Sequence, residues 1–412
     1  MRVWPTTERV SAGNVSIFAI PFSSDSGPNH PCISLDRSDS SAKTIILCVY
    51  VSDFHYDLPE ERIAQEPLAD RSASRMLRVL RERREFQDRA FRDFPDLFHP
   101  DDLLVINNTR VFPARLYGRR GGSRAQAVSP NNPSAREFLH GRVEVLLTRQ
   151  FSQSPNEWEC LVRPGRKIGV AEQLFFGTDD QLQAEVLARG AYGERRIRFV
   201  PVDDFFDLLG KFGHVPLPPY IARDDRTSDR DRYQTVYARE RGSVAAPTAG
   251  LHFTPEIMHR IKERGIEIAE VTLHVGLGTF QPVHEGRVED NKLHSEVYSV
   301  SGEAAAQINR ALEAGRRIVA VGTTTVRTLE FAAQQSANGR VEAATGEANL
   351  FIYPGFDFRV VGALLTNFHL PESSLLMLVC AFGGQKLVLD AYRHAVSAKY
   401  RFYSYGDCMF LE

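Results

Sequence analysis

The chain of 412 residues has few cysteines, no long apolar run and almost no net charge, and each shortage excludes a class of protein. Its five cysteines are scattered without a C-x-x-C pair, which argues against a zinc ribbon, an iron–sulfur site or a disulfide framework. The formal net charge of -2 provides no global basic field for a nucleic-acid partner. We therefore expect a cytoplasmic protein in which any RNA contact depends on local charge.

Signals for membrane insertion and export are missing as well. The longest apolar runs, near 44–51 and 374–382, are too short to span a bilayer, and the N-terminus lacks a basic segment followed by an apolar one. From 23 to 43 the chain is rich in Ser, Asp, Asn and Pro without an apolar period. We therefore expect residues 1–50 to form a disordered extension.

Short β-like runs fill the stretch from Val143 to Val200. Each run is closed by turn residues, and no helical pattern separates them, which is typical of a small barrel. A segment rich in Gly, Ser, Asn and Pro, 118–137, precedes them and is expected to be a surface loop. These patterns predict an inserted β-barrel domain over 113–201.

Helices and strands alternate from Thr254 onward. Thr254 and Ser301 are suited to begin helices, and Gly265 and Gly315 to end them before the next apolar strand. Such alternation predicts a largely parallel sheet with helices on its faces. The expected fold class is α/β, with a major α/β catalytic domain built from the N- and C-terminal segments 51–112 and 202–412 around the inserted barrel.

Four uncharged blocks place Gly, Thr, Asn or His where an apolar run ends. They are Ala245–Phe253, Val271–Phe280, Val321–Glu330 and Leu364–Leu375. Open α/β sheets assemble ligand crevices at such strand ends. The blocks therefore predict an active site, although GLG in the second block is too short to indicate a dinucleotide-binding glycine motif.

The blocks resemble one family, the S-adenosylmethionine:tRNA ribosyltransferase-isomerases of queuosine biosynthesis. The similarity is collinear from about Val51 to the C-terminus, and only the extension before Val51 and the loop in 118–137 depart from it. Besides the four blocks, the matching stretches are Val51–Arg71, Asp101–Leu116, Gly213–Arg223, Asp231–Ala238, Leu350–Gly355 and Tyr400–Leu411.

The resemblance implies a reaction and its partners. The expected enzyme transfers and isomerises the ribosyl moiety of S-adenosylmethionine onto 7-aminomethyl-7-deazaguanine at the wobble position of the tRNA anticodon loop. Epoxyqueuosine-tRNA, adenine and methionine are the implied products. S-adenosylmethionine is then a co-substrate, and we expect no permanently bound cofactor, no metal, no membrane contact and a monomer. The family pattern also favours a strand pair in 75–93, with a turn near 82–85, where residue propensity permits a basic helix.

The implied chemistry needs a base, an acid for adenine and a neutral amine. Imidazole titrates near neutral pH, so His252, His274 and His369 are catalytic candidates, and Asp407 is a plausible acid or base. Each histidine can equally be a hydrogen-bonded structural residue, and Asp407 can cap a turn. A metal triad of the histidines is disfavoured because no H-E-x-x-H spacing or carboxylate accompanies them.

The co-substrate presents a sulfonium, a carboxylate and an adenine. Aromatic rings suit the cation or adenine, arginines the carboxylate, and a helix N-terminus an anion, while core packing, ion pairing and capping are the ordinary alternatives. The predicted substrate-binding residues are Asn107, Asn108, Thr109, Arg110, Thr248, Gly250, Phe253, Gly276, Gly278, Thr279, Phe280, Thr323, Thr324, Thr325, Arg327, Thr366, Asn367 and Phe368.

Local arginine and lysine clusters supply candidate RNA contacts, although each can be an ordinary solvated face. They are Arg115, Arg119 and Arg120; Arg163, Arg166 and Lys167; and Arg223, Arg226 and Arg230. Two other functions remain open on these residues: an S-adenosylmethionine-dependent tRNA methyltransferase, which would release S-adenosylhomocysteine, and a non-catalytic tRNA-binding protein.

Overall fold

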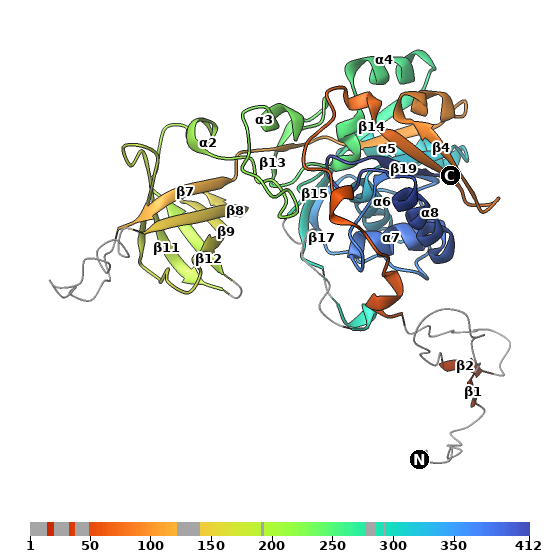
Figure 1. The fold of residues 1–412 in the computed structure, drawn as a ribbon, viewed down its shortest axis with the longest axis horizontal. Helices are drawn as coiled ribbons and strands as arrows, with labels where there is room; N and C mark the ends of the chain where they lie inside the picture. Colours follow the sequence, from red (N-terminus) through yellow and green to blue (C-terminus); the bar gives the residue numbers. More distant parts are fainter. Residues whose placement is uncertain are drawn as a thin grey trace.

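The computed structural model describes residues 15–19, 33–37, 49–121, 141–190, 193–276, 286–291 and 293–412. A barrel lies beside a larger body built on one sheet, and the paired strands β1 (Val15–Ala19) and β2 (Ile33–Arg37) lie apart from both (Figure 1). Of the segment 1–50 that was expected to be disordered, residues 1–14, 20–32 and 38–48 lie outside the described residues. Val49 is already buried in the main core, so that core begins before the expected boundary at residue 50.

The larger body is built on a mixed sheet of nine strands within the described residues. In spatial order they are β17 (Ala344–Ala348), β15 (Glu296–Val300), β14 (Glu267–Leu273), β5 (Leu103–Asn107), β16 (Ile318–Val321), β18 (Ala363–Asn367), β19 (Cys408–Leu411), β3 (Arg75–Leu80) and β4 (Glu85–Ala90). The strands β14, β5, β16 and β18 form a continuous parallel set, which antiparallel pairs flank on both sides, and β19 and β3 form a second parallel pair. The expectation of a largely parallel sheet was wrong outside the set of four strands. On one side β15 and β17 pair antiparallel with their neighbours, and on the other the C-terminal strand β19 pairs antiparallel with β18.

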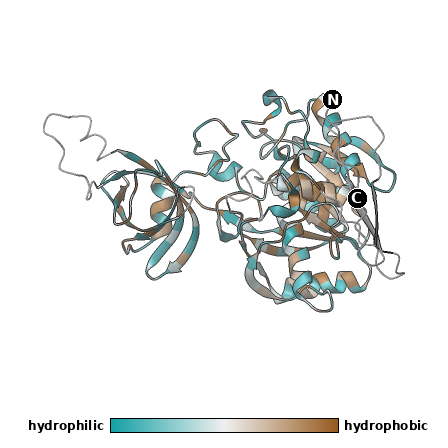
Figure 2. Ribbon diagram, turned by 90° about the horizontal axis from the view of Figure 1, so that it is seen from below, coloured by the Kyte–Doolittle hydropathy of each residue, from teal (hydrophilic) through white to brown (hydrophobic). Residues whose placement is uncertain are grey.

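Apolar side chains of the central strands are buried on both faces of the sheet. In β5, Leu103 and Val105 pack in the core that includes the helices α5 and α6, whereas Leu104 and Ile106 pack with residues of α4. Figure 2 shows hydrophobic residues concentrated in these central strands. Burial on both faces explains why parallel strands read as continuous apolar runs.

The helices follow the capping signals. They are α2 (Phe205–Phe212), α3 (Asp229–Arg232), α4 (Pro255–Glu263), α5 (Gly302–Glu313), α6 (Thr323–Gln335), α7 (Ser374–Gly383) and α8 (Gln385–Ser397). Thr254 and Ser301 cap α4 and α5 with their hydroxyls, which confirms both predicted starts. In the block Val321–Glu330, the sequence GTTTVR (322–327) was expected to form a loop before a helix. Its threonines instead form the first turn of α6, which begins directly after Gly322, and the φ of 87° at Gly322 suits glycine.

The barrel and the strand pair β3–β4 confirm two further predictions. Six antiparallel strands close on themselves through the pairing of β10 with β7. They are β7 (Arg115–Arg120), β8 (Arg142–Gln153), β9 (Asn156–Arg163), β10 (Gln173–Phe176), β11 (Leu182–Arg189) and β12 (Glu194–Phe199). The fold class is therefore confirmed, and 75–93 contains the strand pair β3–β4 rather than a helix.

A short parallel pair joins two segments between the barrel and the sheet: β6 (Thr109–Val111) and β13 (Glu240–Ser243). Among the described residues, no single helix is long and apolar enough to cross a membrane. The pair α7 and α8 reaches that length and composition only together, with a bend of 116° between them.

Glu330 on α6 is a buried carboxylate that organises the chain entering β18. Its oxygens accept hydrogen bonds from the backbone N–H groups of Arg359, Val360 and Val361 at 2.9–3.1 Å. Replacing it with alanine leaves three backbone donors without their acceptor. We expect Glu330→Ala to lower the free energy of unfolding by about 3 kcal/mol in urea denaturation. Glu263→Ala, at an exposed ion pair on α4, should change it by less than about 1 kcal/mol, and equal losses would contradict this role.

Candidate active site

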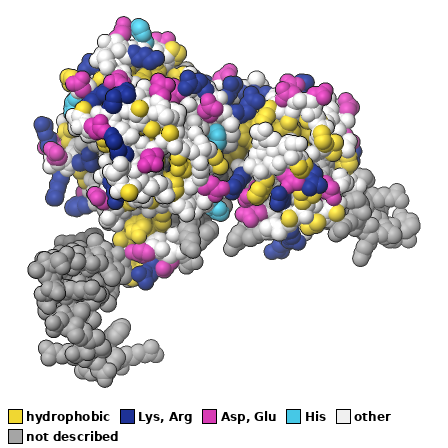
Figure 3. Space-filling model, turned by 180° about the vertical axis from the view of Figure 1, so that it is seen from behind, with side chains coloured by type: hydrophobic (Ala, Val, Ile, Leu, Met, Phe, Trp, Pro, Cys, Tyr) yellow, Lys and Arg dark blue, Asp and Glu magenta, His cyan; other side chains and the backbone are white. Residues whose placement is uncertain are grey.

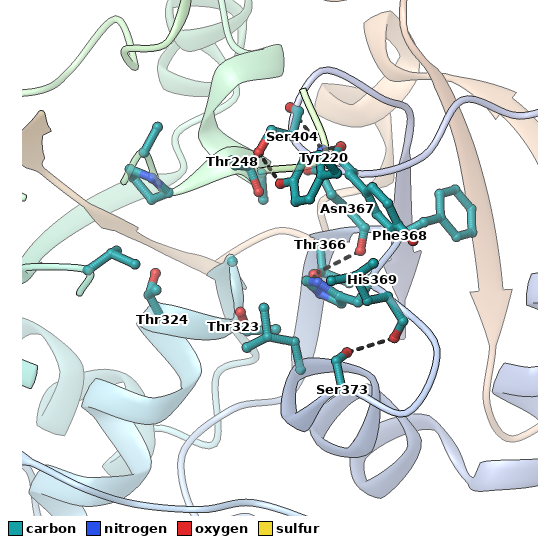
Figure 4. A pocket seen from close by; sticks show the side chains of 18 residues that line it. Tyr220, Thr248, Thr323, Thr324, Thr366, Asn367, Phe368, His369, Ser373 and Ser404 are labelled. Atoms are coloured by element: carbon teal, nitrogen blue, oxygen red, sulfur yellow. Dashed lines mark hydrogen bonds between the residues drawn. The ribbon is translucent and has the colours of Figure 1, made fainter. Parts of the chain in front are cut away.

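A cavity lies outside the carboxyl ends of the parallel strands (Figure 4). It holds about 640 Å³ of space free of protein atoms, part of it open solvent. All four uncharged blocks contribute to its wall. The lining residues are Tyr220, Ala246, Pro247, Thr248, Ala249, Val275, Gly322, Thr323, Thr324, Thr366, Asn367, Phe368, His369, Leu370, Ser373, Leu375, Tyr403 and Ser404. Because β14 and β16 flank β5 on opposite sides, the chain crosses over at this point, which is where open α/β sheets bind ligands.

His369 is the one of the three candidate histidines that lines the cavity. Its Nε2 lies 2.8 Å from Thr366 Oγ1, and its backbone N–H donates to the Tyr392 hydroxyl at 3.1 Å. Burial lowers the pKa of His369 to about 3. The imidazole is therefore neutral near pH 7 and keeps a nitrogen lone pair.

His252 lies behind the wall and supports Asn367. The Asn367 amide donates to the carbonyls of Tyr403 at 2.9 Å and Ser404 at 3.4 Å, so its Oδ1 faces His252 Nε2 at 3.1 Å. That orientation requires His252 to carry its proton on Nε2, since an amide oxygen only accepts. Burial lowers the pKa of His252 to about 4, although the Asn367 hydrogen bond opposes the shift. His252 is thus placed to orient Asn367.

His274 and Asp407 do not line the cavity. His274 Nδ1 lies 2.8 Å from Thr109 Oγ1, and burial lowers the pKa of its imidazole. The carboxylate of Asp407 accepts from the backbone N–H groups of Arg75 at 2.9 Å and Arg401 at 2.8 Å, while burial raises its pKa. The geometry of Asp407 matches the turn-capping alternative, and it holds the loop that carries Tyr403 and Ser404.

The asparagines that end β5 link strands and helix. Asn107 donates to the Leu273 carbonyl at 3.0 Å and to Thr324 Oγ1 at 3.3 Å. Asn108 bonds Glu270 and accepts from Thr272 Oγ1 at 2.7 Å. Both are buried away from the cavity, so they set the position of α6 and β14.

The two candidate arginines lie elsewhere. Arg327 is buried in an ion pair with Glu296, and Glu296 also accepts from the Gly276 backbone N–H at 3.0 Å. Removing Arg327 would leave the buried carboxylate of Glu296 without this partner. Arg327→Ala is therefore expected to reduce the stability of the fold, and a loss of activity in it would not identify a ligand contact. Arg110 is exposed and lines a separate depression beside Arg230 and Arg241.

Other candidates occupy core positions. Phe253 packs against Phe91 and Phe94, and a Cβ at Gly250 would lie 2.2 Å from the Tyr237 hydroxyl. Thr325 Oγ1 donates to the Val321 carbonyl at 2.6 Å. Phe368 lines the cavity, but its ring lies 4.8 Å from that of Phe402 in the core. Three further candidates, Gly278, Thr279 and Phe280, lie outside the described residues.

Several lining residues escaped the residue-by-residue reasoning. The Tyr220 hydroxyl lies 2.7 Å from Ser404 Oγ, and its ring centroid is 4.6 Å from that of Tyr403. Both tyrosines belong to stretches that carried the family resemblance, so that resemblance was the available signal. Among the described residues, no group of three or more His, Cys, Asp or Glu side chains is arranged to hold a metal ion.

An α/β sheet whose strand ends carry a largely apolar cavity with a few hydroxyl, amide and imidazole groups is typical of enzymes that bind small molecules. A family model described as "Queuosine biosynthesis protein" matches residues 51–411, and the chain belongs to this family. An S-adenosylmethionine:tRNA ribosyltransferase-isomerase from Solibacter usitatus is 57% identical over 88% of this chain and 99% of its own length. One from Symbiobacterium thermophilum is 49% identical over the same shares. The crystal structure of an S-adenosylmethionine tRNA ribosyltransferase from Thermotoga maritima is 38% identical, covers 88% of this chain and 100% of its own, and has a TM-score of 0.48.

The buried histidines make stability depend on pH. The pKa values of folded His252 and His369, about 4 and about 3, lie below the ordinary value of 6.5. The unfolded chain therefore binds more protons as pH falls from 6.5 toward 4, and the free energy of unfolding decreases over that window. We expect His252→Gln to reduce this slope between pH 6.5 and 5 by about 1 kcal/mol per pH unit, measured by urea denaturation. An unchanged slope would show that His252 is not held neutral by the fold.

Proposed function

We propose that the protein transfers and isomerises the ribosyl moiety of S-adenosylmethionine onto 7-aminomethyl-7-deazaguanine at the tRNA wobble position. The products are epoxyqueuosine-tRNA, adenine and methionine. The convergence of four uncharged blocks on one cavity carries this proposal, together with relatives that bear the corresponding enzyme name over nearly their whole length.

Different parts of the cavity wall suit different parts of the co-substrate. Thr323 and Thr324 begin the 13-residue helix α6, whose first-turn N–H groups favour a carboxylate such as that of the methionine moiety. The rings of Tyr220 and Tyr403 offer faces for adenine or the sulfonium. Thr248 and Asn367 add hydrogen-bonding groups for the ribosyl part.

We assign the proton transfer to His369. Removal of the acidified proton beside the sulfonium requires a base in its unprotonated form, and burial keeps this imidazole unprotonated. A cation bound beside it lowers the pKa of an imidazole further, whereas a developing negative charge on the substrate raises it. His252 acts through Asn367 as a positioning residue and does not touch the substrate.

We extend the proposal to the localisation, the oligomeric state, the use of a metal and the domain boundaries. We propose a cytoplasmic monomer that uses S-adenosylmethionine as co-substrate without a metal, and that modifies an unpaired base of the anticodon loop. We also propose that 113–201 is a domain inserted between 51–112 and 202–412. All six strands of the closed barrel, from the start of β7 at Arg115 to the end of β12 at Phe199, fall within 113–201, which supports these boundaries.

The reaction is tested by incubating the protein with S-adenosylmethionine and tRNA that carries 7-aminomethyl-7-deazaguanine. Nucleoside mass spectrometry should detect epoxyqueuosine, with adenine and methionine released in equal amounts. Formation of S-adenosylhomocysteine and a methylated base would establish a methyltransferase instead. Retained tRNA binding without any product would indicate the non-catalytic alternative.

His369→Gln should lower kcat at saturating substrates by about 100-fold, because the cavity loses its neutral imidazole. The control is His259→Gln on the exposed face of α4, which should leave kcat within about twofold. Both variants should retain the circular dichroism of the wild type. An unchanged kcat for folded His369→Gln would remove His369 from the proton-transfer step.

A further inference from the structure

Three exposed arginines at one end of the barrel carry no ion pair within the described residues. Arg163, Arg166 and Arg189 are exposed, and within the described part of the chain no hydrogen bond or ion pair engages their guanidinium groups. They lie where β9 and β11 end and β12 begins (Figure 1), around a depression with about 750 Å³ of free space, open solvent included. We call these three residues the barrel-end arginines.

The other arginine clusters identified from the sequence are neutralised by the fold. Arg115, Arg119 and Arg120 pair with Glu144, Asp180 and Glu172, respectively. In the third cluster, Arg223 pairs with Asp229, Arg226 pairs with Glu66, and Arg230 donates to the carbonyls of Gly210 and Gly213. On the face drawn in Figure 3, basic and acidic side chains are interspersed. Of the three clusters, the one that contains Arg163 and Arg166 therefore keeps arginines without a carboxylate partner among the described residues.

The loop that carries Arg163 and Arg166 is held from beneath by Arg195. This guanidinium is buried and donates only to backbone carbonyls: those of Ile168 at 2.8 and 3.0 Å, Glu194 at 2.6 Å, and Gly165. The Val162 N–H also donates to the Gly193 carbonyl at 3.0 Å, which connects the end of β9 to the turn between β11 and β12. The barrel-end arginines therefore project from a fixed backbone, which lowers the entropy cost of binding.

Charge at this end is strongly positive. No carboxylate is among the residues that line the depression in the described part of the chain, although Glu194 lies beside Gly190 and Glu144 is paired with Arg163 across strands β8 and β9 of the barrel sheet. Burial and the charge of Arg189 lower the pKa of Arg195, as expected for cations that lack a counter-ion. The lining includes one apolar side chain, Val162, and no aromatic ring. The depression therefore has neither a ring on which a base could stack nor an apolar surface for hydrophobic binding.

We propose that the barrel-end arginines bind phosphate groups of the RNA substrate outside the cavity. Guanidinium forks match phosphate oxygens in two-point contacts, and a row of them recognises a backbone without reading its bases. A wobble base splayed into the cavity leaves the adjoining stem available to a second surface on the barrel. This assignment rests on the proposed function, since that function supplies the RNA.

The test compares two triple variants with the same change in charge. R163Q/R166Q/R189Q removes the barrel-end arginines. The control, R119Q/R226Q/R393Q, removes three exposed arginines that are each paired with a carboxylate, Asp180, Glu66 and Asp390. Binding of tRNA that carries 7-aminomethyl-7-deazaguanine is measured from 50 to 200 mM salt. A third variant, R163K/R166K/R189K, keeps the charge but loses the fork geometry.

R163Q/R166Q/R189Q should bind tRNA at least tenfold more weakly, with a slope of log affinity against log salt that is smaller by about 2 to 3. Its KM for tRNA should rise while kcat and the KM for S-adenosylmethionine stay unchanged. The lysine variant should keep the wild-type slope, and the control should bind as the wild type does. If the wild type converts tRNA but R163Q/R166Q/R189Q and R119Q/R226Q/R393Q show the same slope, the barrel-end surface is refuted and the proposed function is not. If the wild type neither binds nor converts tRNA, the proposed function is refuted as well.

Discussion

Two buried asparagine amides, at the ends of the strands on either side of β16, hold the walls of the cavity together. Asn107 ends β5 and connects it to β14 and to Thr324 in the first turn of α6. Asn367 ends β18 and connects it to the C-terminal loop and, through His252, to Ser74. A buried amide is costly unless all its groups are paired, so each asparagine permits only one arrangement of the segments around it. Of the lining residues, Thr324, Tyr403 and Ser404 are held directly by these amides.

Burial also sets the charge state inside this framework. His252 and His369 are surrounded by core side chains, and desolvation disfavours their protonated forms. Neutral imidazoles form directional hydrogen bonds and do not repel a sulfonium. The cavity thus combines neutral polar groups with aromatic faces, a setting suited to a cationic co-substrate.

The ionic groups are distributed differently. Arg327 with Glu296, and Arg317 with Asp102 and Glu412, form pairs inside the larger body, where each charge is compensated. Such pairs specify an arrangement more than they stabilise it. The barrel-end arginines, by contrast, have no ion pair among the described residues, and Arg195 holds the loop that follows Arg163. One molecule thereby separates a neutral chemical site from a basic surface, and salt affects only the second strongly.

Local chemistry in the sequence was sufficient for the barrel, the caps of α4 and α5, and the blocks around the cavity, because turn residues and strand ends are governed by neighbours along the chain. The family resemblance was needed for the β3–β4 hairpin, where propensity alone permitted a helix. Tertiary structure alone decided that His369 faces the cavity while His252 lies behind Asn367. It also decided that Tyr220 meets Ser404 across 184 positions of the chain, and that Arg163 and Arg166 lack the carboxylates that pair with Arg119 and Arg223. Partners distant along the chain are chosen by packing, and no periodicity or motif records that choice.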